Sequence, residues 1–275
     1  MSAVALPAPA TRGVRRTGAA VVLPLATVEA RRLLLHPVML AGIAVFLVHT
    51  ISSTLTDPTP RTAFSAVVDL PSFVPGVFAI LAANLVASRD VRAGSVEMLT
   101  PAPARPAPRV GALCLAGLVP AVLMQALVLV LWAWHLALER YVDPPTAAHL
   151  LQGPVTVAGA CLLGVLLAVW VPTRATGIIA LVVMVALNVW LGGREGAVEL
   201  FGPMVHWPEW GLMFARDWVG FIPGSPGWHV VYLLGLTAAA GAGALVRVSD
   251  RRTPAVLATL AALALAVVAG IAQLP

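Results

Sequence analysis

The sequence contains no lysine, and all 17 of its basic residues other than histidine are arginines. A Walker A loop needs a lysine that reaches the nucleotide phosphates, so this chain has no conventional P-loop ATPase site of its own. The HExxH motif of zinc proteases and the GxSxG motif of nucleophile-elbow hydrolases are also missing from the sequence. We therefore expect a protein that is not an enzyme by itself.

Charge of either sign is scarce. Charged residues make up 11% of the chain and hydrophobic residues 60%, and the mean hydropathy is +0.93. A soluble domain of 275 residues would need more charge on its surface. One bilayer crossing takes about 20 apolar residues, so the chain is long enough for several crossings. The composition predicts an all-α fold, a polytopic integral membrane helix bundle.

The chain has only two cysteines, Cys114 and Cys161, and both lie in apolar stretches. They form no CxxC or haem-attachment motif, so we expect no metal or other cofactor in this chain. The pI is near 10.5, which could indicate nucleic-acid binding. However, the arginines are scattered between apolar stretches, a pattern that favours orientation in a membrane over binding to nucleic acid.

Apolar stretches predict six core spans and an additional seventh. The expected windows are 38–56, 66–88, 110–138, 151–171, 176–192, 228–246 and 254–273. The second window is expected to bend or break around Pro71 and Pro75. Either 254–273 is a full seventh span, which puts the C-terminus outside, or window 176–192 does not cross completely.

The N-terminal region is expected to have two parts ahead of the transmembrane domain, residues 37–275. Residues 1–20 are rich in Ala, Pro and Arg, which predicts a disordered cytoplasmic tail. Residues 21–36 predict an interfacial helix with Glu29 and Arg32 on one face. A cytoplasmic extension of the first span is the alternative, although Pro37 favours a break.

The arginines predict a protein of the cell membrane whose N-terminus lies in the cytoplasm. With that orientation, cytoplasmic segments contain Arg12, Arg15, Arg16, Arg31, Arg32, Arg89, Arg92, Arg105, Arg109, Arg174, Arg247, Arg251 and Arg252. Outer segments contain only Arg61, Arg140, Arg194 and Arg216, as the positive-inside rule requires. The outer segment 193–227 is too apolar for a solvated loop, and we expect re-entrant helices there.

Few polar side chains are expected deep in the membrane, and those few are neutral. Asn84, Gln125 and Asn188 either hydrogen-bond neighbouring helices or line a substrate path. Asp69 is the one acid that could enter a span, with an interfacial position favoured. A carrier driven by protons or sodium ions usually needs ionisable groups in the bilayer, so this composition gives it little support.

The most distinctive stretch follows the second window and reads SRDVRAGSVEML over residues 88–99. It resembles the permease subunits of the ABC type-2 exporter family, whose second and third spans are joined by a cytoplasmic segment R-[ED]-x-x-x-G-[TS]-x-[ED]-x-L. The positions that match this pattern are Arg89, Asp90, Gly94, Ser95, Glu97 and Leu99. The P-[VI]-[ST] that usually follows is replaced by the proline-rich residues 101–108, so the local shape there departs from the family pattern.

This resemblance implies a membrane-spanning permease of an ATP-driven exporter, with ATP bound by a separate ABC ATPase subunit. A second permease subunit would complete a homo- or heterodimer, and membrane lipid would surround it. Segment 89–109 would then couple the permease to the ATPase, with Arg92 as a further charged anchor; a plain arginine-rich loop is the alternative. The apolar spans favour a drug-like, lipid-like or other amphiphilic substrate. A non-transporting assembly or sensor protein and a secondary carrier remain the alternative functions.

Overall fold

The computed structural model describes residues 18–93, 106–192 and 225–273. Throughout these residues the regular structure is α-helical, which confirms the all-α fold. The helices are α1 (Gly18–Leu34), α2 (Pro37–Thr56), α3 (Pro60–Val67), α4 (Asp69–Ala87), α5 (Arg89–Arg92), α6 (Pro106–Ala137), α7 (Ala147–Trp170), α8 (Arg174–Gly192), α10 (Pro226–Val248) and α11 (Arg252–Ala272).

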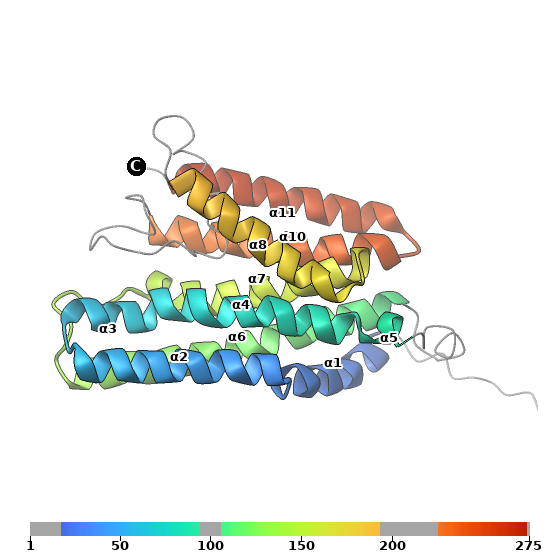
Figure 1. Ribbon diagram of the computed structural model, residues 1–275. Helices are drawn as coiled ribbons and strands as arrows, with labels where there is room; N and C mark the ends of the chain where they lie inside the picture. The colour runs from blue at the N-terminus through green and yellow to red at the C-terminus, as the bar shows by residue number, and fades with distance from the viewer. Residues whose placement is uncertain (1–17, 94–105, 193–224, 274–275) are drawn as a thin grey trace, which may run out of the picture.

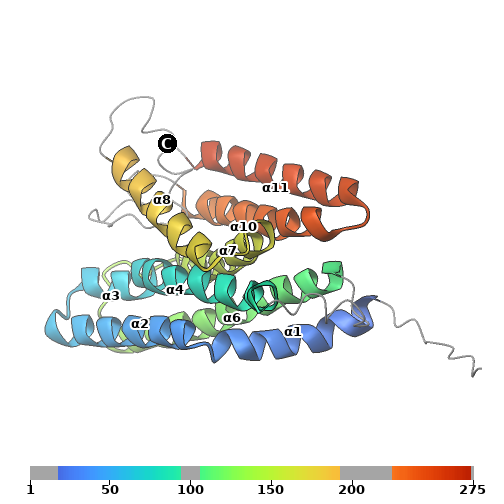
Figure 2. The same ribbon diagram turned by 45° about the vertical axis from the view of Figure 1, so that its right-hand side comes forward.

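Six helices among the described residues are long and apolar enough to cross a membrane, so the chain is a multi-pass membrane protein. Five of them are the single helices α2, α6, α7, α10 and α11, and the sixth consists of α3 and α4 together, Pro60–Ala87. Helix α8, the expected window 176–192, is not among the six, because its apolar described part covers only Arg174–Ala186. It nevertheless runs obliquely from one end of the bundle to the other (Figures 1 and 2).

Helix α7 lies at the centre of the bundle. It packs against α4 and α6 on one side and against α10 on the other, and α11 packs on α10 (Figure 1). Close approach of α4 and α7 depends on Gly164, where an added Cβ would lie 2.6 Å from the carbonyl oxygen of Ile80. The core is formed mainly by small and β-branched side chains, as is usual where transmembrane helices pack closely.

The two ends of the bundle differ in charge. We call the end where α1 lies the α1 end (Figure 1). The described arginines at the α1 end are Arg31, Arg32, Arg89, Arg92, Arg109, Arg174, Arg247, Arg251 and Arg252. The opposite end has only Arg61 and Arg140 among the described residues, and α11 finishes there.

Prolines and capping side chains determine several helix boundaries. The break expected at Pro37 is present: α1 ends at Leu34, and Pro37 is the first residue of α2, where its missing N–H leaves no bond unmade. His36 caps α2, since its Nδ1 accepts a hydrogen bond of 3.3 Å from the Val38 N–H. At the opposite end, Thr146 and His149 form a capping box at the start of α7.

The break in the second span lies earlier than expected. Helix α3 ends at Val67 and α4 begins at Asp69, so the prediction of a break around Pro71 and Pro75 was wrong in position. Pro71 is the third residue of α4, where the backbone N–H has no partner within the helix in any case. Pro75 lies inside α4 and removes one backbone hydrogen bond without ending the helix.

Candidate functional site

The candidate site is a cluster of charged residues at the α1 end, where α1 meets the junction of α4 and α5. Glu29 of α1 is buried, with 7% of its surface exposed. The Arg89 guanidinium donates two hydrogen bonds to it, Nη1 to Oε2 and Nη2 to Oε1, both 2.6 Å long. This parallel geometry is the strongest form of arginine–carboxylate pairing. It joins residues 60 positions apart in the chain.

Two further groups surround this pair. Arg32 donates from Nη1 to Glu29 Oε1 at 3.0 Å, and Arg89 Nε lies 3.3 Å from Asp90 Oδ1. The hydrogen bonds to Glu29, together with its negative charge, raise the pKa of Arg89 above its ordinary value. Arg89 therefore remains a cation, and Glu29 is the buried anion that it neutralises.

Arg92 attaches α5 to the end of α4. Its Nη2 donates a 2.6 Å hydrogen bond to the Leu85 carbonyl oxygen, and its Nε donates to Ser88 Oγ at 3.1 Å. Ser88 Oγ in turn donates to the Asn84 carbonyl oxygen at 2.6 Å. A cation that binds the last carbonyl groups of a helix also lies favourably in the helix dipole. Helix α5 is thus held to α4 by Arg92 and to α1 by Arg89.

His36 belongs to the same end of the molecule. Burial, and after it the positive charge of Arg92, lowers the pKa of His36 below its ordinary value of 6.5. The neutral ring is also the form that can accept the hydrogen bond from the Val38 N–H. The N-terminus of α2 is therefore sensitive to protonation of one side chain.

The sequence indicated part of this cluster and missed its main contact. Arg89, Asp90 and Arg92 were expected as coupling residues, and they lie together at the junction of α4 and α5. Glu29 was expected on the polar face of a surface helix, yet it is buried because Arg89 pairs with it. The available signal was a single glutamate in α1, followed by Arg31 and Arg32, but nothing in the sequence identified Arg89 as its partner.

The remaining expected coupling residues, Gly94, Ser95, Glu97 and Leu99, lie outside the described residues. The same holds for residues 1–17 of the expected tail, for most of segment 89–109 and for residues 193–224 of the expected re-entrant segment. The described parts of these regions are residues 18–20, 89–93, 106–109 and 225–227.

The three neutral residues expected in the membrane do not form one site within the described structure. Asn84 is buried between α4, α7 and α8; its Nδ2 is 3.5 Å from the Gly164 carbonyl oxygen and its Oδ1 has no hydrogen-bond partner among the described groups. Gln125 lies half-buried in α6, where its Oε1 also has no such partner. Asn188 belongs to α8, but its side chain is outside the described part of the chain.

A second group of polar residues, some buried and some half-buried, was not expected from the sequence. His135 of α6 is fully buried, and neither ring nitrogen has a hydrogen-bond partner among the described residues. Close to it at the end opposite α1, Arg140 donates to the Thr54 carbonyl oxygen at 3.1 Å and Tyr141 donates to the Ala63 carbonyl oxygen at 3.5 Å. These two bonds connect the loop after α6 to α2 and α3.

The described residues include no group of three or more His, Cys, Asp or Glu side chains that could hold a metal ion. The contacts at the α1 end join α1 to the junction of α4 and α5. Comparison of the chain with protein-family models, with curated proteins and with solved structures finds no match.

Proposed function

We propose that this chain is the membrane-spanning permease subunit of an ATP-driven ABC exporter. The observation that carries the proposal is the paired 2.6 Å contact of Arg89 with Glu29. Arg89 is the first residue of the stretch that resembles the exporter segment, and Glu29 belongs to the helix before the first span. A force applied to segment 89–109 would therefore act on α1 as well as on α4.

Contacts on both sides of the pair make this transmission physically reasonable. Helix α1 packs against α6, and Arg92 holds α5 on the last turn of α4. Short, charge-assisted bonds between buried or half-buried groups resist displacement more than a solvated loop does. Movement of the segment would thus displace α1, α4 and α6 together.

The remaining parts of the proposal concern partners and orientation. Because the chain has no lysine for a Walker A loop, ATP would bind to a separate ATPase subunit. A second permease subunit would complete the transporter. The arginine-rich α1 end would face the cytoplasm, and the C-terminus would then lie outside the cell membrane. The substrate class proposed is a drug-like, lipid-like or other amphiphilic molecule.

The proposal is tested by affinity purification of the tagged chain from its own membranes in mild detergent, followed by measurement of vanadate-sensitive ATP hydrolysis. We expect ATPase activity that co-purifies with the chain and that falls at least tenfold when Arg89→Glu or a scrambled 89–99 segment is introduced. Asp143→Arg, which reverses the charge of an exposed residue at the opposite end, is the control and should retain the activity.

Equal ATPase recovery from the scrambled and unaltered chains would contradict the proposal. A complete lack of associated ATPase would favour a non-transporting membrane protein or a secondary carrier. Those two are separated by solute flux that collapses with the proton gradient, which only the carrier would show.

A further inference from the structure

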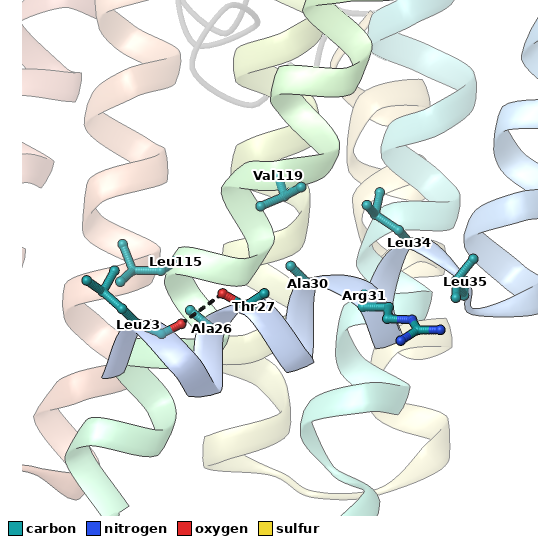
Figure 3. A pocket seen from close by; sticks show the side chains of 9 residues that line it. All are labelled: Leu23, Ala26, Thr27, Ala30, Arg31, Leu34, Leu35, Leu115 and Val119. Atoms are coloured by element: carbon teal, nitrogen blue, oxygen red, sulfur yellow. Dashed lines mark hydrogen bonds between the residues drawn. The ribbon is translucent and has the colours of Figure 1, made fainter. Parts of the chain in front are cut away.

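An open groove of about 680 Å³ lies between α1 and α6 at the α1 end. Figure 3 shows α1 crossing α6 at a steep angle, with side chains of both helices lining the space between them. The lining residues are Leu23, Ala26, Thr27, Ala30, Arg31, Leu34, Leu35, Leu115 and Val119. This volume falls within the range of about 300–1,000 Å³ that is usual for small-molecule sites.

The groove offers an occupant hydrocarbon contact and almost no hydrogen bonding. All but two of its lining residues are apolar. The Thr27 hydroxyl already donates to the Leu23 carbonyl oxygen at 3.1 Å. Leu115 and Val119 are also exposed on the outer surface of α6, so the groove is continuous with the surface that faces the membrane. An acyl chain entering from the bilayer would remain in apolar surroundings throughout.

Arg31 gives the groove one charged position (Figure 3). Its side chain is exposed, and no acidic group among the described residues pairs with it. Glu29, two residues earlier, points to a different face of α1 and is already bound by Arg89 and Arg32. A free guanidinium beside an apolar groove at the membrane surface complements a phosphate that carries an acyl chain.

We propose that this groove binds one anionic phospholipid from the leaflet at the α1 end, with an acyl chain between α1 and α6 and the headgroup phosphate on Arg31. The bound lipid would fill the space beneath α1 and support its position against α6. This inference depends on the membrane location of the chain and not on an ATPase partner, so it can fail or hold independently of the proposed transport function.

The test is native mass spectrometry of the full chain purified in mild non-ionic detergent and titrated with dioleoyl phosphatidylglycerol or dioleoyl phosphatidylcholine. We expect one phosphatidylglycerol retained per chain, bound at least tenfold more tightly than phosphatidylcholine. Arg31→Gln should abolish this preference. Val119→Trp, which fills the groove from an exposed position, should weaken binding of both lipids.

Arg251→Gln is the matched control, because it removes an exposed arginine at the same end but outside the groove; it should bind phosphatidylglycerol as the unaltered chain does. Thermal unfolding of each variant establishes that it is folded. Equal retention of both lipids, an unchanged preference in Arg31→Gln, or displacement of the lipid by millimolar inorganic phosphate alone would overturn the proposal.

Discussion

The contact between Arg89 and Glu29 is expected to stabilise the fold far more than the neighbouring contact between Arg32 and Glu29. Arg89 makes two 2.6 Å bonds to the buried carboxylate, whereas Arg32 makes one of 3.0 Å from a side chain that is 54% exposed. Removing one partner of a fully buried ion pair costs about 3–5 kcal/mol. Because Arg89 is 33% exposed and Arg32 remains beside the carboxylate, we expect Arg89→Gln to cost about 2 kcal/mol.

A cost of about 2 kcal/mol corresponds to roughly a 30-fold change in the unfolding equilibrium. Arg32→Gln removes an exposed arginine that makes one bond to Glu29 within the same helix, and the expected cost is about 0.3–0.5 kcal/mol. The free energy of unfolding can be measured by SDS titration in mixed micelles, followed by tryptophan fluorescence. A double-mutant cycle with Glu29→Gln isolates each pair.

The two cycles should give clearly different coupling energies, above about 1 kcal/mol for Glu29 with Arg89 and below about 0.5 kcal/mol for Glu29 with Arg32. Equal losses in the two arginine variants would refute the reasoning. A coupling energy for Glu29 with Arg89 that is no larger than the value for Glu29 with Arg32 would refute it too, because the contact between α1 and α5 would then be too weak to transmit force.

Three other outcomes follow from the described contacts. Gly164→Ala should destabilise the protein by about 1–3 kcal/mol, because the new Cβ would lie 2.6 Å from a backbone oxygen of α4. Gly111→Ala is the control, since an added Cβ there would have nothing within 4 Å. It should be neutral or slightly stabilising in the same SDS titration. The folded state lowers the pKa of His36 below 6.5. The stabilising contribution of His36 is therefore complete above pH 6.5 and decreases as the pH falls below that value. His36→Asn keeps a capping acceptor and should show less loss of stability between pH 7 and pH 5. Arg247→Ala removes a 2.7 Å bond to the Trp170 carbonyl oxygen from an exposed site, so it should cost no more than about 1 kcal/mol by the same titration, and a loss larger than that of Arg89→Gln would contradict this ranking.

Much of the fold could be predicted because membrane crossings require long apolar runs that a sequence displays directly. The expected windows 110–138 and 254–273 correspond to α6 and α11 within a few residues. The helix boundary at Pro37 followed from proline geometry in the same way. The break before Asp69 did not, because the two prolines that predict a break nearby, Pro71 and Pro75, are both accommodated within α4.

The candidate site was less predictable because its main contact is not local. An attraction between Glu29 and Arg32 follows from helix periodicity, but the pairing of Glu29 with Arg89 depends on how α1 crosses the end of the bundle. The burial of Asn84 against Gly164 likewise depends on the packing of α4 on α7. Sequence spacing indicates which residues share a face of one helix, but it does not indicate which helices pack against each other.

The central claim is that segment 89–109 transmits force from a separate ATPase, and photo-cross-linking from that segment in native membranes tests it most directly. A photoreactive amino acid at position 96 should form an adduct whose second chain contains a Walker A sequence, identified by mass spectrometry. The same amino acid at position 142, in the loop at the opposite end, should form none. Adducts from position 96 that contain only lipid or a second copy of this chain would contradict the account.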